Sequence, residues 1–468
     1  MTFQGPPDHP QRQLLADEVH ARPFEPVATP SSAGYLAVLL PEAAREGELA
    51  HLAELARAFG VAPPQPGDTL WRATLLGAAP GAGDGVAARE GAALRLKWER
   101  HGEFSGYLFL RRDRDDHGGD GGGDAAGGPD GAGASTPAPW EALPEGWLAG
   151  VPGQTLVAVA VAIRRSPPTG AAGSSAGRAA DAAWLADHFG GQPVCGSSIG
   201  NGAGFAYTDF RLRPEEGHVR MLLVDAGFNP RQAGRMLQRL LEIEAYRMLA
   251  LLALPIARRL SPRIAAIESA LVHLTGGIAS DDGRGEELLH ELTRLAAEVE
   301  GALAASRFRF GACRAYAELV SRRIEELRER RIEGLQTVHE FMSRRFSPAV
   351  ATCATVEQRL HDLSERVSQA SSLLGTRVGI AREKQNQLLL ASMERRARLQ
   401  LRLQQTVEGL SVAAILYYVV GLVAYVAKGL EAGGAPVDAA VVVLAAVPVA
   451  GVAVLWALRR AHRRLREP

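Results

Sequence analysis

The stretch Leu410–Ala427 reads LSVAAILYYVVGLVAYVA, and Val437–Leu458 reads VDAAVVVLAAVPVAGVAVLWAL. Each approaches the ~20 apolar residues that a helix needs to cross the hydrocarbon core of a bilayer. Only Lys428–Pro436 (KGLEAGGAP) lies between them. Because this link is short, we expect residues 410–427 and 437–458 to form a transmembrane helical hairpin whose two ends lie on one side of the membrane.

Basic residues flank this hairpin and predict its orientation. The arginines on its two outer sides are Arg395, Arg396, Arg398 and Arg402 before it, and Arg459, Arg460, Arg463, Arg464 and Arg466 after it. The link carries one lysine and one glutamate. The positive-inside bias therefore predicts a multi-pass protein with both termini in the cytoplasm, ending in a basic tail over residues 459–468.

Composition narrows the class of protein further. The chain has 468 residues, enough for two or three domains, and a formal net charge of zero, so no overall basic field favours nucleic-acid binding. Cys195, Cys313 and Cys353 are far apart in the sequence and form no CxxC pair, which suits a reducing cytoplasm. The N-terminus has no signal-sequence pattern.

Residues 1–228 predict a cytoplasmic mixed α/β domain. Strands are expected at Tyr35–Leu40 and Thr155–Ile163, a strand-turn-strand unit at Leu94–Leu110, and a hairpin from Phe205–Leu212 and Val219–Asp225. Glu48–Phe59 has helical spacing. The Gly-rich segments 117–139 and 166–177 lack periodicity and predict flexible insertions.

Residues 229–409 predict a stalk of long antiparallel coiled-coil helices. Asn229-Pro230, Ser261-Pro262 and Ser347-Pro348 each place a capping side chain before a proline, so helices are expected to begin near 230, 262 and 348. Another is expected near Glu286, and Pro255 should kink or end the first. The heptad stripes are Leu288, Leu292, Leu295, Val299 and Ala302, then Val356, Leu360, Leu363, Val367, Ala370 and Leu374, resuming at Leu399, Leu403, Thr406 and Leu410.

Candidate sites in the cytoplasmic domain are few. Glu99, His101 and Glu103 alternate along one predicted strand, where they would form a divalent-metal or acid/base site, or a solvated strand face. Glu18 and Arg22 predict either an anion site or, preferably, a salt bridge that pins the N-terminal segment. No cofactor follows from these residues.

Two further patterns are weighed against structural alternatives. Gly196–Gly200 (GSSIG) matches G-x-S-x-G, with Ser198 as nucleophile, but strand-like residues follow it and favour a Gly-rich loop. Glu244 lies on an apolar stripe and needs a partner, such as Arg235 or Arg247. We expect an ion pair that locks the α/β domain to the stalk, with ligand sensing as the alternative.

The predicted spans carry polar groups near their ends and no charge at mid-depth. Residues that would line a pore or its mouth in an oligomer are Tyr417, Tyr418, Gly421, Tyr425, Lys428 and Asp438. The alternative is that the tyrosines are packing or interfacial groups, with Gly421 allowing close helix approach.

This layout resembles the CorA-type divalent-cation channels, homopentamers in which the first of two C-terminal spans lines the pore. That family carries Gly-Met-Asn after the first span, whereas this chain has Tyr425-Val426-Ala427-Lys428-Gly429. The chain is also similar to a bacterial family of membrane-anchored proteins known as a domain of unknown function. The similar stretches are Asp17–Pro23, Lys97–Tyr107, Thr208–Arg211, Pro230–Pro255 and Leu403–Gly429.

These observations favour a homo-oligomeric, non-enzymatic protein of the bacterial inner membrane. One interpretation is a CorA-like ion channel or transporter with a cytoplasmic sensing domain, for which the partner is a divalent cation. The alternative is a membrane-tethered scaffold or sensor whose hairpin is only an anchor. Its partners would be the lipid bilayer and further copies of the chain, with no nucleic acid.

Overall fold

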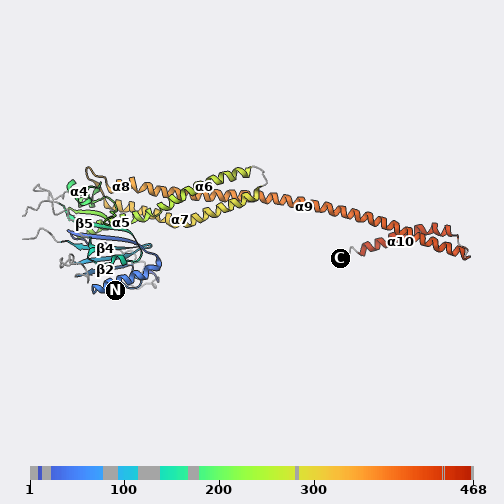
Figure 1. Cartoon of the computed structure of the whole chain (residues 1–468), viewed down its shortest axis with the longest axis horizontal. Coiled ribbons are helices and arrows are strands. Elements are labelled where there is room, and N and C mark those ends of the chain that lie inside the picture. The colour runs from blue at the N-terminus through green and yellow to red at the C-terminus, as the bar shows by residue number, and fades with distance from the viewer. Residues whose placement is uncertain are drawn as a thin grey trace, which may run out of the picture. The chain divides into compact units, whose positions relative to one another are not determined.

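The computed structural model describes residues 9–12, 23–76, 93–113, 138–166, 179–279, 284–434, 436 and 438–464 (Figure 1). Contacts divide the chain into two compact units. Unit 1 comprises Met1–Gly276 and Leu292–Ser368, and unit 2 comprises Gly277–Glu291 and Gln369–Pro468. Unit 1 therefore contains the sheet together with much of the helical segment that follows residue 228.

Unit 1 contains a mixed sheet of nine strands in the order β2-β3-β4-β1-β5-β8-β7-β6-β9. The strands are β1 Ser31–Leu39, β2 Leu70–Leu75, β3 Leu94–Arg100, β4 Phe104–Arg112, β5 Gln154–Arg165, β6 Cys195–Ile199, β7 Gly204–Thr208, β8 Val219–Asp225 and β9 Arg330–Arg331. Neighbours are antiparallel except β5 and β8, which are parallel. The predicted strands and the β7–β8 hairpin are confirmed, although β7 ends at Thr208.

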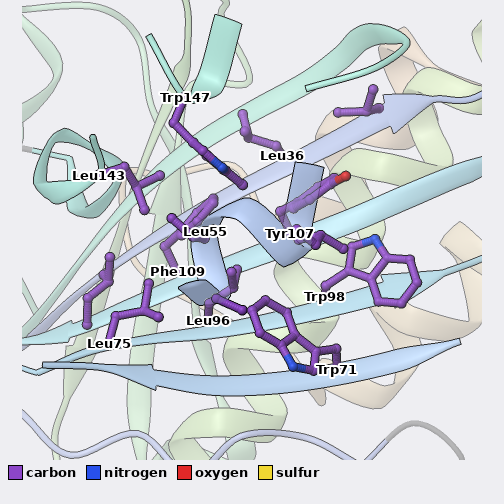
Figure 2. Packing of buried hydrophobic residues seen from close by; sticks show 14 residues of the cluster. Leu36, Leu55, Trp71, Leu75, Leu96, Trp98, Tyr107, Phe109, Leu143 and Trp147 are labelled. Carbon is purple, nitrogen blue, oxygen red and sulfur yellow. The ribbon is translucent and has the colours of Figure 1, made fainter. Parts of the chain in front are cut away.

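Large side chains in register build the core on one face of the sheet. Trp71 lies opposite Trp98, Trp98 opposite Tyr107, and Tyr107 opposite Leu36, so one row crosses β2, β3, β4 and β1. Leu55 and other residues of helix α2 (Arg45–Ala58) pack over this row (Figure 2). Aromatic residues that each bury on the order of 150–250 Å² make the row a main source of stability in unit 1.

Three of the four helix starts predicted after residue 228 agree with the structure, and one does not. The remaining helices are α4 Ala182–Phe189, α5 Pro230–Leu251, α6 Leu254–Ala279, α7 Gly285–Leu327, α8 Val338–Arg345, α9 Ser347–Ala432 and α10 Ala439–Arg464, with short 3-10 helices η1 Glu42–Ala44, η3 Pro139–Ala142, η4 Leu148–Gly150 and η5 Gly200–Gly202. Asn229 caps α5 by accepting a hydrogen bond from the Gln232 amide at 2.8 Å. The starts near 230, 286 and 348 are confirmed to within one residue.

The predicted helix start at residue 262 is wrong, because Pro262 lies inside α6. A proline within a helix removes one backbone hydrogen bond and crowds the preceding turn. Apolar side chains on both sides of it, including Leu260, Ile264 and Ile267, are buried and offset that cost. The break instead falls before Leu254, next to Pro255, as predicted for the end of α5.

Helices α6, α7 and α9 pack together within unit 1. Arg314 pairs with Glu357 at 2.7 Å, and Ser364 donates a hydrogen bond to Glu300, so residue numbers rise on α7 as they fall on α9. This pair is therefore antiparallel, as predicted. The stripe residues buried in unit 1 are Leu292, Leu295, Val299, Val356, Leu360, Leu363 and Val367. Coiled-coil geometry for the bundle stays a prediction.

The predicted insertions 117–139 and 166–177 lie outside the described residues except at their edges. Pro139 begins η3, so the first predicted segment extends too far at its C-terminal end. The predicted Gly-rich loop at 196–200 is also wrong, because Gly196–Ile199 belongs to β6. Pairing with β7 on one side and β9 on the other satisfies the backbone there, which outweighs the weak strand propensity of glycine and serine.

Candidate functional site

A short extended segment, Pro23–Val27, is held against the sheet by basic side chains, and we call it the strap. Lys97 Nζ donates to the Pro23 carbonyl at 2.8 Å, and an Arg95 N–H donates to the Pro26 carbonyl at 2.7 Å. The Val27 amide donates to the Pro230 carbonyl of α5 at 2.9 Å. The strap is thereby fixed by both β3 and α5.

A glycine of α5 makes room for the strap. A Cβ atom placed on Gly234 would lie 1.9 Å from the Glu25 carbonyl oxygen, which is impossible without displacement. Phe24 packs against Arg235, whose guanidinium lies 5.1 Å from the ring centroid. Glu18 and Arg22, the residues predicted to pin this segment, lie outside the described residues.

The three residues of the predicted metal site do not share one strand face. β3 ends at Arg100, so His101 lies in the turn and Glu103 precedes β4. The His101 ring stacks on Phe104 with centroids 4.3 Å apart. The predicted alternation of Glu99, His101 and Glu103 along one strand is therefore wrong, because the strand ends at Arg100 and a turn follows it.

Both carboxylates of that trio have cationic partners. Glu99 Oε1 lies 2.9 Å from Nζ of the buried Lys97, and Glu103 pairs with Arg309 of α7. Burial and a hydrogen bond to Glu103 raise the pKa of Tyr316 well above its ordinary value. Within the described ranges, no group of three or more His, Cys, Asp or Glu side chains is suited to hold a metal ion.

Glu48 of α2 is a buried carboxylate that the sequence analysis missed. Its side chain accepts hydrogen bonds from Trp98 Nε1 at 2.9 Å, from the Tyr107 hydroxyl at 2.6 Å and from Arg100 at 3.0 Å. Burial and the neighbouring carboxylate raise the pKa of Tyr107 far above its ordinary value. These donors satisfy the charge, which is the arrangement of a structural ion pair.

Glu244 on α5 is 2% exposed and makes a two-pronged ion pair with Arg247. The two N–O distances are 2.6 and 3.0 Å. The Arg247 guanidinium also lies 5.4 Å from the ring of Phe210, which stacks on Phe341 of α8. Phe210 has a φ of 51°, a left-handed conformation that a bulky residue adopts only when its surroundings impose it.

The G-x-S-x-G pattern does not form a nucleophile elbow. Ser198 lies within β6 opposite Phe205 of β7 and Arg330 of β9, not on a strand-to-helix turn. Its neighbour Ser197 donates a hydrogen bond to Glu329 at 2.5 Å, and Glu329 also accepts from the Val338 amide at the start of α8. The serines of β6 therefore serve the packing of the sheet edge.

Two cysteines that are far apart in sequence meet between α7 and α9. Cys313 and Cys353 are both free and buried. A hydrogen bond between the two thiols lowers the pKa of Cys313 and, together with burial, raises the pKa of Cys353. The antiparallel pairing of the helices brings these thiols together, and the wide separation of the two cysteines in the sequence gave no signal for it.

In unit 2, the apolar part of α9 and helix α10 are exposed. Two helices are long and apolar enough to cross a membrane, with 6% of one apolar window buried and 0% of the other. Tyr417, Tyr418 and Tyr425 are at least 75% exposed, and Gly421 and Lys428 are also exposed. Asp438 accepts a hydrogen bond from the Ala440 amide at 2.9 Å and so caps the start of α10.

A family model described as "Protein of unknown function (DUF3422)" matches residues 7–465. The chain belongs to this family. No curated protein and no solved structure matches the sequence. The DUF3422 match includes every stretch on which the resemblance to a domain of unknown function rested, whereas the likeness to CorA-type channels stays a hypothesis.

The side-chain contacts of this DUF3422 chain that were not predicted from its sequence share one property. The residues missed, Glu48, Lys97 and the Cys313–Cys353 pair, all depend on contacts between elements distant in the chain. No signal in the sequence indicated that Lys97 is buried, because the alternation of Leu94, Leu96 and Trp98 with polar residues predicts Lys97 on the polar face of the strand.

Proposed function

We propose that this protein is anchored in a membrane by the C-terminal part of α9 and by α10. The observation that supports the proposal is the near-complete exposure of both apolar windows. A core helix of a water-soluble protein would be buried against its own chain, and exposing the apolar surface of an isolated helix to water costs free energy. A bilayer provides the apolar surroundings that these helices lack.

Charges around the two helices support one orientation. Arg395, Arg396, Arg398 and Arg402 are exposed on α9 ahead of its apolar part, and Arg460 is exposed near the end of α10. Lys428 and Glu431 are the charged residues near the link. The positive-inside rule then places both termini in the cytoplasm, with the link on the other side.

The anchor would hold unit 1 at the membrane as a tethered scaffold or sensor. Three ionisable groups buried in unit 1 each have an oppositely charged partner and stabilise its packing. The pairs are Glu48 with Arg100, Lys97 with Glu99, and Glu244 with Arg247. In the part of the chain that the structure describes, we identify no nucleophile, base and oxyanion site in reacting geometry. In this proposal, unit 1 binds a ligand or partner at the membrane surface.

A CorA-like homo-oligomeric channel is the second candidate, and the continuity of α9 favours it. The helix runs unbroken from Ser347 to Ala432, so a movement of its first part would be carried into the apolar part. Tyr417, Gly421 and Lys428 would then line a narrow path or its mouth. The channel requires about four or more copies, since each contributes only two spans.

Membrane extraction tests the anchor directly. The full chain should remain with the membrane pellet in alkaline carbonate, whereas Ile415→Arg with Val419→Arg should release a large fraction, because mid-span arginines each cost ~2.5–3.5 kcal/mol. Leu390→Arg with Leu401→Arg is the matched control, since these exposed leucines precede the apolar part. Release of the unaltered chain by carbonate would overturn the proposal.

Ion flux in liposomes distinguishes the two candidates. A channel predicts cation-dependent flux that changes with Lys428→Ala, together with a detergent-corrected mass of four or more copies. A tethered scaffold predicts no flux above that of empty liposomes at any mass. Flux that is equal with and without the protein would overturn the channel.

A further inference from the structure

One face of α9 carries a long, regular stripe of exposed residues ahead of the apolar part. Successive members are separated by four and three residues in alternation, the average spacing of 3.5 that lets helices pack side by side along their length. The members are Leu389, Met393, Arg396, Gln400, Leu403, Val407 and Leu410, and we call them the α9 stripe.

The apolar members of the α9 stripe are uncovered by the described chain. Leu389, Met393, Leu403, Val407 and Leu410 are between 56% and 69% exposed. By contrast, Leu374, earlier on the same helix in unit 2, is 1% exposed. A row of large apolar side chains left in water is unusual for a monomer and marks a surface that another molecule covers.

The spacing continues without a break into the apolar part of α9. Ala414, Tyr417, Gly421, Ala424 and Lys428 extend the same spacing, and all of them are exposed except Ala424, which is half-buried. The other half-buried or buried positions of this part lie on another side of the helix, at 412, 416, 420, 423 and 427. At ~100° per residue, that side is turned about 130° from the stripe, so coverage inside unit 2 leaves the stripe free except at Ala424.

The area is sufficient for a specific contact between two copies. At ~25 cal/mol per Å², the 1.5–3 kcal/mol for burying an aliphatic side chain corresponds to about 60–120 Å² of apolar surface. The five apolar members of two facing stripes therefore bury on the order of 1,000 Å² before the apolar part is included, which reaches the lower range of specific interfaces.

We propose that the α9 stripe is a self-association surface, on which α9 packs in parallel against α9 of a second copy of this chain. The parallel direction rests on the proposed membrane anchor, because copies inserted in one orientation must run side by side. In such a pairing, like residues meet, and the Gln400 amide can both donate to and accept from its counterpart. A polar layer of this kind fixes the register of the pair.

Cysteine cross-linking tests the surface, using the full chain in its native membranes. Leu403→Cys should give a covalent dimer with a mild oxidant, at least ten-fold more than Leu401→Cys. Leu401 is a matched control because it is similarly exposed, at 59% against 67%, but lies two residues off the stripe. Equal cross-linking at the two positions, or a Leu403→Cys adduct with the mass of another protein, would overturn the proposal.

Charge insertion separates this surface from the membrane anchor. Leu403→Glu with Val407→Glu should reduce the detergent-corrected mass to one copy while the protein stays in the carbonate-resistant membrane fraction. Leu390→Glu with Leu401→Glu, off the stripe, should leave the mass unchanged. A single-copy mass for the unaltered chain would overturn self-association, whereas loss of the unaltered chain from the membrane fraction would overturn the anchor and the parallel direction that rests on it.

Discussion

Glu48 and Glu244 are both buried carboxylates, and each is stabilised by donors from its immediate surroundings. Glu48 is held by side chains of α2's neighbouring strands, and Glu244 by an arginine one turn away on its own helix. A local partner such as Arg247 can be predicted from helical spacing. Partners such as Trp98 and Tyr107 cannot, because they depend on the register of two strands with a helix.

Removing the arginine of the buried pair should destabilise unit 1. Arg247→Ala leaves the Glu244 carboxylate without its charge partner, and we expect a loss of about 3–5 kcal/mol. Near-UV circular dichroism of the full chain in detergent, during thermal unfolding, measures the loss. Arg231→Ala, an exposed arginine of the same helix, should change stability by about 0.5 kcal/mol or less. Equal effects of the two substitutions would contradict the pairing.

His188 of α4 makes the stability of unit 1 depend on pH. Burial and the nearby Arg220 lower the pKa of His188 to about 4. Between about pH 6.5 and pH 4 the unfolded chain binds this proton and the folded chain does not, so stability is retained above pH 6.5 and falls as the pH drops. At pH 5 the loss is about 2 kcal/mol.

His188→Gln removes this titration. Between pH 7.5 and pH 5 the variant should therefore lose about 2 kcal/mol less than the unaltered chain, as measured by denaturant unfolding at both pH values. Carboxylates elsewhere titrate in both proteins, so they cancel from the comparison. Parallel loss of stability in the two proteins would show that the histidine is hydrated in the folded state.

Helices and strands were predicted correctly where the signal lies within a short stretch of sequence. The cap at Asn229, the start of α9 at Ser347 and the alternation in β5 depend on residues within one or two turns or a single strand, and the structure agrees with them. The helix start predicted at Pro262 was wrong because a proline inside a helix is tolerated when apolar residues before and after it are buried. Helix α8 was missed, although Thr337 and Glu340 form a capping box at its start.

The contact between the strap and α5 depends on one glycine. Gly234→Ala would place a Cβ on the Glu25 carbonyl, so we expect the strap to leave α5 and the Val27 amide to lose its bond to Pro230. Hydrogen exchange of the full chain should show faster exchange over residues 23–28. The control is Gly301→Ala in α7, which meets no atom within 4 Å and should stabilise its helix by ~0.5–1 kcal/mol. Unchanged exchange over the strap would contradict the close approach.

At the scale of the whole molecule, composition and patterning predicted the mixed sheet, the long helices and the two apolar helices. They did not predict which parts form compact units, because those depend on contacts such as Arg309 with Glu103, which joins α7 to the start of β4. The apolar helices were the clearest signal in the sequence because the length and hydrophobicity of a helix can be judged within one segment.

The anchored topology makes a prediction for accessibility from the two sides of the membrane. Gly433 is exposed in the link after α9, and Ser392 is exposed on α9 ahead of the apolar part. Single replacements, Gly433→Cys or Ser392→Cys, can be labelled with a membrane-impermeant maleimide in right-side-out and inverted vesicles. The natural cysteines are buried, so their background should be low.

We expect Gly433→Cys to be labelled in right-side-out vesicles and Ser392→Cys in inverted vesicles, because the positive-inside rule predicts that the proposed spans insert with their arginine-rich ends in the cytoplasm. The opposite pattern would mean that the spans insert with reversed orientation. Labelling of both positions in the same vesicles would mean that α9 does not cross the bilayer. In that case the exposed apolar surface of unit 2 would have to be covered by protein, and the α9 stripe would be only one part of a larger interface between copies.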